Sequence, residues 1–347
     1  MKLQLKSLPE QVLVITGASS GIGLVTAKMA AEEGARVVLA SRNENDLETA
    51  VEDIRHRGGE AVYVVADVAD PGDVEKIADA AVRAFGRIDT WVNNAGVALY
   101  GPIMDLDLED MRRQFDVLYW GVVHGCRTAV PHLAQNGGAL INVASVLADR
   151  SVPLQGNYSA AKHAVKGFTD ALRMELEAEG LPISVTLIKP TSIDTPLFDK
   201  AKTLLEVEPQ PVPPVYAPEI VARAILDCAQ KSVRELNVGG AGRAMTAATG
   251  LAPRISDLVL EKTGFEKQKS DIPASHRDNL FAPLEHDGGE RGRNWRGRVK
   301  ETSVYTRAAL HPGTAALAAL GIGAGLLAGA RALRSRKAAA EVGISSR

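Results

Sequence analysis

The stretch Gln11–Gly23, QVLVITGASSGIG, decides the fold of this 347-residue chain. Its first half, Gln11–Thr16, is a short apolar run rich in β-branched residues, typical of a strand buried in a parallel sheet. Its second half carries glycines at positions 17, 21 and 23, and a helical apolar pattern continues from there to Glu33. We therefore expect a strand that turns through glycines into a helix.

The same pairing of an apolar run with a helical pattern recurs as far as residue 238. Further apolar runs lie at 36–40, 61–65, 89–92, 139–143, 183–188 and 235–238. Helical patterns separate them, at 44–57, 71–85, 108–134, 158–179 and 218–230. Because strictly alternating strands and helices call for a parallel sheet, we expect an α/β fold. It would be a doubly wound Rossmann sheet of about seven strands with helices on both faces.

Gly17, Gly21 and Gly23 stand where the first strand turns into the first helix. Glycine permits backbone conformations that are closed to other residues and lets a pyrophosphate approach a helix N-terminus. The alternative is a tight turn that binds no ligand. The strand before these glycines and the helix after them favour a dinucleotide site.

The end of the second predicted strand indicates which dinucleotide binds. An acidic residue there accepts a hydrogen bond from the 2′-hydroxyl of the adenosine ribose, whereas an arginine accommodates a 2′-phosphate. This chain has Ala40-Ser41-Arg42, with no carboxylate before Glu44. We therefore expect NADP(H) in preference to NAD(H), which stays open. The alternative is that Arg42 is only a solvated side chain.

Tyr158 and Lys162 are four residues apart in a predicted helix and so share one of its faces. A tyrosine ordinarily titrates near pH ~10. A neighbouring ammonium favours the phenolate, so Lys162 is expected to lower the pKa of Tyr158 and make it a usable acid and base. This spacing alone is weak support for a function.

Four signals occur in order along the chain: TGASSGIG at Thr16–Gly23, NNAG at Asn93–Gly96, Ser145, and Tyr158 with Lys162. Together they resemble the short-chain dehydrogenase/reductase family in its single-domain form. The resemblance runs from about Pro9 to Gly242, and the ordered set is far more specific than any one signal.

The resemblance implies hydride transfer between a nicotinamide and a carbonyl or alcohol carbon. Tyr158 would supply the proton, Ser145 would hold the substrate oxygen, and Lys162 would perturb Tyr158 and bind the nicotinamide ribose. Asp67 would contact the adenine, with Val68 beside it. The complete set of implied cofactor-binding positions is Gly17, Ser19, Ser20, Gly21, Ile22, Gly23, Arg42, Asp67, Val68, Asn94, Ala95, Gly96, Tyr158, Lys162, Pro190, Ile193 and Thr195.

Two positions depart from the family pattern. Phe115–Gly121 reads FDVLYWG, so Leu118 stands where the family has an asparagine that helps hold a proton-relaying water. Leucine has no polar atom and cannot hold that water. Either protons take another route, through a different group or bulk solvent, or the chain binds the cofactor with weak or no turnover. The second departure is Thr191, which replaces the family glycine after Pro190 and could alter the local backbone.

The proline-rich connection 196–218 follows a strand end, where long connections are usually functional. We expect it to form the substrate lid. It has no cluster of basic residues, which argues against phosphorylated substrates and favours a carbonyl or secondary alcohol on an apolar skeleton.

The charge and cysteine content of the chain indicate which partners it can bind and in which cellular compartment it works. Net charge is −2, with 16 basic and 10 acidic residues from Met245 onward. The acidic body argues against nucleic-acid binding, and the basic tail suits an anionic membrane surface. The presence of only two cysteines argues against a disulfide framework and fits a reducing compartment, so we expect a cytoplasmic protein that could associate with a membrane through its C-terminal helix. The spacing of the histidines and cysteines predicts no metal site.

The predicted domain organisation is a catalytic domain over 1–243, a charged and partly helical extension over 244–307, an apolar helix over 308–330 and a basic tail over 331–347. Within the extension, 266–301 is expected to be a solvated linker. The apolar helix would reach roughly 34 Å, enough to span a bilayer. The alternative is an amphipathic or soluble alanine-rich helix that packs on a partner.

Three classes of function follow. The first is an NADP(H)-dependent oxidoreductase acting on a small carbonyl or alcohol. The second is an NADP-binding protein with weak or no turnover, because of Leu118. The third is a membrane-tethered scaffold. The family resemblance suggests a homo-dimer or homo-tetramer built through the long helices.

Overall fold

A seven-stranded parallel sheet forms the centre of the computed structural model, which describes residues 3–311 and 313. The strand order is β11-β7-β6-β4-β1-β2-β3. The strands are β1 (Val12–Thr16), β2 (Arg36–Ser41), β3 (Glu60–Val65), β4 (Thr90–Asn93), β6 (Gly138–Val143), β7 (Ile183–Pro190) and β11 (Glu235–Val238). The order reverses between β1 and β4, where a doubly wound sheet places its ligand site. The fold class expected from the sequence is confirmed.

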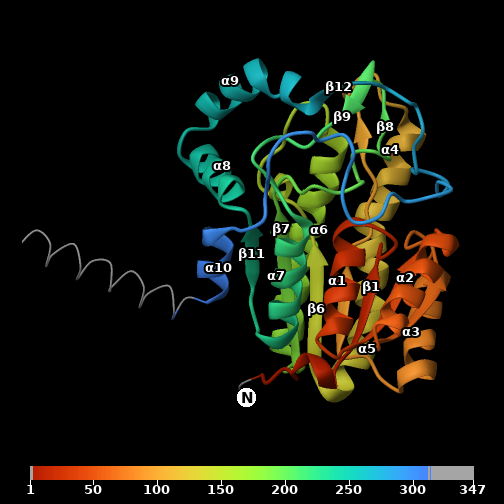
Figure 1. Ribbon diagram of the computed structural model, residues 1–347. Coiled ribbons are helices and arrows are strands. Elements are labelled where there is room, and N and C mark those ends of the chain that lie inside the picture. The colour runs from red at the N-terminus through yellow and green to blue at the C-terminus, as the bar shows by residue number, and fades with distance from the viewer. Residues whose placement is uncertain (1–2, 312, 314–347) are drawn as a thin grey trace, which may run out of the picture. The chain divides into compact units, whose positions relative to one another are not determined.

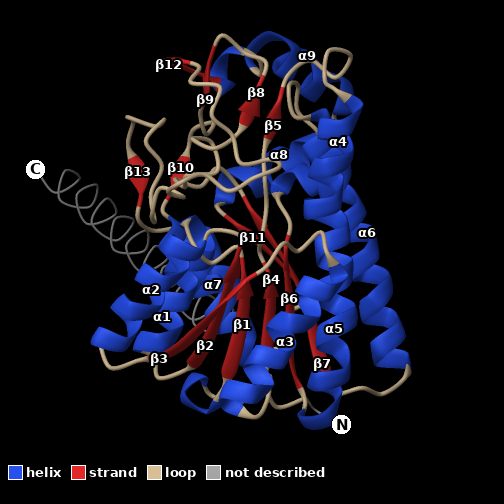
Figure 2. Cartoon of the chain, turned by 90° about the vertical axis from the view of Figure 1, so that its right-hand side faces the viewer, coloured by secondary structure: helices blue, strands red, loops and turns tan. Residues whose placement is uncertain are grey.

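Helices cover both faces of the sheet (Figures 1 and 2). One face carries α1 (Gly21–Glu32), α2 (Glu44–His56) and α7 (Pro218–Gln230). The other carries α3 (Pro71–Phe85), α4 (Leu108–Phe115), α5 (Gly121–Asn136) and α6 (Gly156–Ala178). The long helix predicted over 108–134 is interrupted by one π-helical turn, η2 (Asp116–Trp120). Such turns concentrate at functional sites.

Local chemistry sets the helix ends. The carboxylate of Asp70 accepts hydrogen bonds from the backbone N–H groups of Gly72 and Asp73 at 2.7 and 3.1 Å. Pro71 occupies the first helical position, where its missing N–H costs nothing. Gly86 ends α3 in the left-handed conformation, with φ of 77°.

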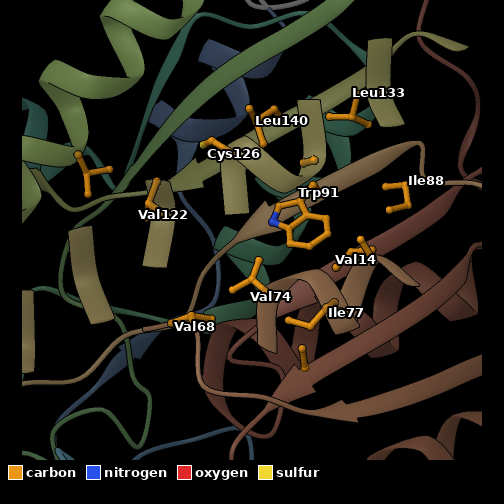
Figure 3. Close-up of a cluster of buried hydrophobic side chains, with 14 of the residues drawn as sticks. Val14, Val68, Val74, Ile77, Ile88, Trp91, Val122, Cys126, Leu133 and Leu140 are labelled. Carbon is orange, nitrogen blue, oxygen red and sulfur yellow. The ribbon is translucent and has the colours of Figure 1, made fainter. Parts of the chain in front are cut away.

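The core lies between the sheet and the helices of each face. Trp91 of β4 is fully buried among side chains of β1, α3 and α5, including Val14, Ile77 and Cys126 (Figure 3). Its Nε1 donates a hydrogen bond of 2.8 Å to Oδ1 of Asn93, so the buried indole N–H is satisfied. Burial on both faces explains why the central strands are continuous apolar runs.

Short elements stand at the carboxyl ends of the strands. Three two-stranded pairs join β5 (Leu99–Tyr100) to β8 (Lys202–Thr203), β9 (Val207–Pro209) to β12 (Lys269–Pro273), and β10 (Val215–Tyr216) to β13 (Val299–Lys300). The helices α8 (Gly240–Leu251) and α9 (Pro253–Thr263) lie at the same end of the molecule, to the left of β8, β9 and β12 in Figure 1. Three 3₁₀ turns complete the set: η1 (Leu8–Glu10), η3 (Val146–Ala148) and η4 (Glu266–Gln268).

The expectation of a solvated linker over 266–301 is wrong. This segment adds two strands to the body of the protein and makes many hydrogen bonds to it. The reason is that backbone carbonyls and charged side chains hold it in place. Such contacts leave no apolar periodicity for a sequence pattern to reveal.

The chain divides into two compact units, Met1–Ser303 and Val304–Arg347. The first therefore extends past residue 243, where the sequence predicted the catalytic domain to end. In the second, α10 (Val304–Leu310) is described. The apolar helix predicted over 308–330 lies mostly, and the basic tail over 331–347 wholly, outside the described residues. No helix among residues 3–311 and 313 is long and apolar enough to cross a bilayer.

Candidate active site

A cavity of about 630 Å³ opens at the carboxyl ends of the sheet strands. Its wall contains every residue that the sequence proposed for the site except Gly23. These residues are Gly17, Ser19, Ser20, Gly21, Ile22, Arg42, Asp67, Val68, Asn94, Ala95, Gly96, Ser145, Tyr158, Lys162, Pro190, Ile193 and Thr195.

The glycine turn and the NNAG turn are locked together. Nδ2 of Asn94 donates to the carbonyls of Thr16 and Gly17 at 3.0 and 3.3 Å. Gly17 has φ of 66°, and a Cβ there would lie 2.7 Å from Cα of Ala95. A Cβ on Gly23 would lie 2.2 Å from the carbonyl oxygen of Gly17. Gly23 therefore lets the helix pack under the turn, which explains why it does not line the cavity.

Ser145 and Tyr158 meet in the middle of the cavity wall. Ser145 caps the N-terminus of η3, and its Oγ accepts a hydrogen bond of 3.1 Å from the backbone N–H of Leu147. Its side chain also hydrogen-bonds to the Tyr158 hydroxyl. Burial raises the pKa of Tyr158 to about 12, and the hydrogen bond with Ser145 opposes that rise.

The lowered pKa that the spacing with Lys162 predicted for Tyr158 is wrong, because burial of the phenol raises that pKa instead. Nζ of Lys162 lies 5.7 Å from the centre of the Tyr158 ring, over its face. Loss of hydration around the phenol outweighs any attraction to that ammonium. Tyr158 is therefore protonated at neutral pH and poised to donate.

Lys162 is buried in the wall and its donors are not all used. Nζ donates a hydrogen bond of 2.9 Å to the carbonyl oxygen of Val143, the only described residue that accepts from it. An ammonium has three N–H donors, so two remain for other acceptors. Burial lowers the pKa of Lys162 to about 8. An amine with spare donors beside a phenol suits the hydroxyls of a nicotinamide ribose, so these residues fit such a cofactor.

The two departures from the family pattern are accommodated differently. Leu118 is fully buried in the π-helical turn, and its Cδ2 lies 3.4 Å from where a Cβ on Gly96 would stand. Position 118 thus contributes only apolar atoms. Thr191 continues the pairing of β7 with β11, since both its N–H and its hydroxyl donate to the carbonyl of Val238 at 3.0 Å. Its φ is not positive, so the missing glycine causes no strain.

Arg42 is engaged by the C-terminal part of the first unit. Its Nη1 donates to the carbonyls of Leu280 and Phe281 at 3.3 and 3.1 Å, and its Nη2 donates to that of Asn279. Asp67 lies 4.0 Å away and is also paired with Arg113. Burial lowers the pKa of Arg42, and Asp67 opposes that change. The arginine predicted to meet a 2′-phosphate therefore already holds three carbonyl oxygens.

Sequence reasoning missed three residues of this C-terminal segment, Asn279, Pro283 and Asp287, that line the cavity. The carboxylate of Asp287 accepts from the hydroxyl of Ser19 and lies 3.2 Å from Nζ of Lys200. No local signal could have found this contact, because Ser19 and Asp287 are 268 residues apart.

The other end of the cavity is apolar. Leu197, Phe198 and Val212 come from the connection 196–218, which was predicted to be the lid. The helices α8 and α9 add Met245, Ile255, Val259 and Leu260, all beyond the region of family resemblance. Their apolar periodicity was the one available sequence signal.

Comparisons with known proteins agree with this geometry. A family model described as short chain dehydrogenase matches residues 11–204. The uncharacterized oxidoreductase YxnA of Bacillus subtilis is 44% identical over 342 residues, which cover 96% of this chain and 94% of that protein. The 1-deoxy-11-beta-hydroxypentalenate dehydrogenase of Streptomyces avermitilis is 37% identical over 194 residues, which cover 55% of this chain and 71% of that protein.

A solved structure is similar as well. The crystal structure of a short chain dehydrogenase/reductase from Burkholderia phymatum in complex with NAD has a TM-score of 0.64 and 30% identity to this chain. It covers 71% of this chain and 94% of its own length. Matching fold, family model and relatives lead to one assignment: the chain is an oxidoreductase of the short-chain dehydrogenase/reductase family.

Proposed function

We propose that this chain transfers a hydride between a nicotinamide dinucleotide and the carbonyl or secondary alcohol carbon of an apolar substrate. The observation that carries the proposal is the meeting of Ser145, Tyr158 and Lys162 in one cavity wall, between the glycine turn and an apolar pocket. A bound nicotinamide would supply or accept the hydride at its C4.

Tyr158 acts as the acid in the direction of reduction. A carbonyl oxygen gains negative charge as hydride reaches its carbon, so it needs a hydrogen-bond donor and then a proton. The Tyr158 phenol is protonated at neutral pH and lies partly buried in the wall. Ser145 shares a hydrogen bond with it and orients the same oxygen. Proton transfer from one positioned group contributes roughly 10²–10⁴-fold.

Lys162 supports the phenol after the proton has left. An ammonium near a phenolate lowers the free energy of the charged form, and Nζ is 5.7 Å from the ring centre. Its two spare N–H donors would hold ribose hydroxyls and so fix the nicotinamide beside Tyr158.

A second function has its own support. Leu118 places an apolar side chain at the position of the family's relay asparagine, and it is fully buried. The alternative is therefore an NADP-binding protein with weak or no turnover. We favour a slowed but working reductase, because the three catalytic residues keep their expected spacing.

The phosphate on the cofactor is a separate question. The sequence favours NADP(H), through Arg42 at the end of β2. That preference stays a prediction, and NAD(H) stays open. The Burkholderia phymatum relative has NAD bound. In this chain the guanidinium of Arg42, which was expected to meet a 2′-phosphate, already donates to the carbonyls of Leu280 and Phe281.

Assembly and location belong to the proposal as well. Large apolar side chains are exposed on the long helices, among them Trp120 at 46% and Met174 at 58%. We expect a homo-dimer or homo-tetramer through these helices, and light scattering that shows a monomer would contradict this.

Membrane attachment through 308–330 also stays a prediction. It is tested by fractionating the full chain beside one that ends at Glu301, and equal solubility would remove it.

A spectrophotometric assay with the full chain tests the catalytic proposal. NADH and NADPH oxidation are followed at neutral pH against a panel of apolar aldehydes and ketones. Tyr158→Phe keeps the ring and removes the hydroxyl, so we expect a loss of at least roughly 10²-fold in kcat with nucleotide affinity retained. Equal turnover by the parent and Tyr158→Phe would contradict the assignment of Tyr158. Nucleotide binding without turnover on any substrate favours the alternative.

A further inference from the structure

A strap formed by residues 279–294 lies over the glycine turn and the start of α2. In Figure 1 it belongs to the blue segment that follows β12. Gly21 donates its backbone N–H to the carbonyl of Gly289 at 2.8 Å, and Nδ2 of Asn43 donates to the carbonyl of Leu284 at 2.8 Å. The strap therefore forms part of the cavity wall at the end where the glycine turn lies.

Asp287 is the carboxylate that the strap places in this corner. Its side chain is buried, with 5% of the residue exposed, and it lines the cavity. One oxygen accepts from the Ser19 hydroxyl, and the other lies 3.2 Å from Nζ of Lys200. Its backbone N–H donates to the carboxylate of Asp46, at the start of α2. The position of the carboxylate is thus fixed from three sides.

The corner coincides with the place where a doubly wound fold receives the adenosine ribose. In such folds the residue at the end of the second strand contacts the ribose 2′ position. Here that residue is Ser41, the last residue of β2, and its Oγ is 2.8 Å from Oγ of Ser19. The Ser19 hydroxyl therefore bridges the Asp287 carboxylate and Ser41 at the end of β2. Asp287 supplies from 246 residues downstream the acidic group that the strand itself lacks.

The two cationic side chains nearby, Arg42 and Lys200, are already engaged by the strap. Three strap carbonyls accept from Arg42, as described above. Nζ of Lys200 donates to Oγ of Ser20 at 2.8 Å and pairs with Asp287. A 2′-phosphate in this corner would meet the Asp287 carboxylate and would compete with it and with the strap carbonyls for Lys200 and Arg42. A 2′-hydroxyl would instead donate a charge-assisted hydrogen bond to Asp287.

We propose that Asp287 reads the 2′ position of the adenosine ribose and makes the chain prefer NAD(H) over NADP(H). This preference is the opposite of the one that Arg42 predicts from the sequence. The inference rests on the proposed function, since it concerns the dinucleotide of the same site.

Nucleotide titrations of the full chain test this without any substrate. Dissociation constants for NAD⁺ and NADP⁺ are measured by calorimetry at fixed ionic strength. We expect the parent to bind NAD⁺ more tightly. In Asp287→Asn, which keeps the shape but not the charge, the ratio of the NADP⁺ to the NAD⁺ dissociation constant should fall by about 10- to 100-fold. The loss of the carboxylate also frees Lys200 for the phosphate.

Glu290→Gln is the matched control. It removes one negative charge from the same strap, where Glu290 pairs with Lys28 at 3.0 Å and does not line the cavity. Its ratio should equal that of the parent. Tighter NADP⁺ binding by the parent overturns the inference, as does an equal change of the ratio in both variants.

The parent measurement needs no variant, so it tests the inference even if Asp287→Asn fails to fold. If both nucleotides bind the parent and the ratio is unchanged in Asp287→Asn, only the role of Asp287 fails. If neither nucleotide binds the parent, both this inference and the proposed function fail.

Discussion

The backbone N–H of Gly21, the first residue of α1, donates a 2.8 Å hydrogen bond to the carbonyl of Gly289 in the strap. A helix N-terminus carries partial positive charge and unsatisfied N–H groups, which is why phosphates bind there. One of these donors is here satisfied by a segment from the far end of the first unit. The strap is therefore a structural part of the nucleotide site, and contacts that hold it should affect that site.

The amide of Asn43 offers a direct test of the strap. Its Oδ1 caps α2 by accepting from the N–H of Asp46 at 3.1 Å, while its Nδ2 donates to the strap carbonyl of Leu284. Asn43→Asp keeps the cap but turns the donor into a carboxylate that faces a carbonyl. We expect the free energy of unfolding to fall by about 1–3 kcal/mol and trypsin to cleave the strap faster, at Arg291 and Arg293.

Asn43→Ser is the control for this change, because serine also caps helices and adds no charge. Trypsin should cleave the strap more slowly in Asn43→Ser than in Asn43→Asp. Cleavage rates are followed by mass spectrometry, which identifies the cut sites. Unchanged cleavage of the strap in Asn43→Asp would show that this contact does not hold it.

Leu118→Asn tests the missing proton relay. Asparagine would restore a polar group at a fully buried position in the π-helical turn. We expect kcat for reduction to rise, by up to roughly 10²-fold if the relay limits turnover. Stability should fall by about 1–3 kcal/mol unless the amide finds partners. Leu118→Ala is the control, because it makes room for water without adding a polar group. It shows whether a rise in kcat needs the amide or only the extra space. An unchanged kcat in Leu118→Asn would remove the relay argument.

The strand and helix pattern and the nucleotide-facing turns were predictable because they are local. The bounds of α3, α7 and β11 agree with the sequence patterns, since a cap, a proline or a buried apolar run sets each one within a few residues. The glycine turn and Tyr158 with Lys162 were also visible, because each depends on a short spacing. These elements come together because parallel strands end at one edge of the sheet.

The strap and the pKa of Tyr158 could not be predicted, for different physical reasons. The strap is held by hydrogen bonds from Arg42 to its backbone carbonyls and from Ser19 to Asp287, each across more than 200 positions of the sequence. Every residue has a backbone carbonyl, so contacts made through carbonyls cannot be recognised from residue types in the sequence. The pKa of Tyr158 depends on how much water the folded chain removes, and spacing along a helix does not measure this.

Lys162 makes a pH-dependent contribution to stability. Its pKa is about 8 in the folded chain against an ordinary value of 10.5, so the unfolded chain binds more protons between these pH values. The contribution of this group to the free energy of unfolding therefore rises as pH rises from 8 to 10.5. Below pH 8 the full cost of burying the ammonium is present, and it amounts to about 3 kcal/mol for a shift of this size.

Lys162→Met removes that buried charge and keeps a side chain of similar length. The variant should be more stable than the parent at pH 7, and its advantage should shrink by pH 10. Urea unfolding of both proteins at the two pH values measures the difference. Lys166→Met is the control, because Lys166 is only partly buried and its pKa is raised by Asp149. A constant advantage across pH would contradict the lowered pKa of Lys162.

The apolar wall formed by α8 and α9 should select the substrate. Ile255 is 65% exposed and lines the cavity, whereas Leu251 is 88% exposed on the same helical pair and does not line it. Ile255→Glu should raise KM for long-chain ketones by about tenfold or more and leave the free energy of unfolding nearly unchanged, since the side chain is already largely in solvent. Leu251→Glu adds the same charge outside the cavity and should leave KM as in the parent. Steady-state kinetics with ketones of increasing chain length separate the two variants. A KM that rises equally in both would mean that the added charge acts at a distance, and that α9 does not contact the substrate.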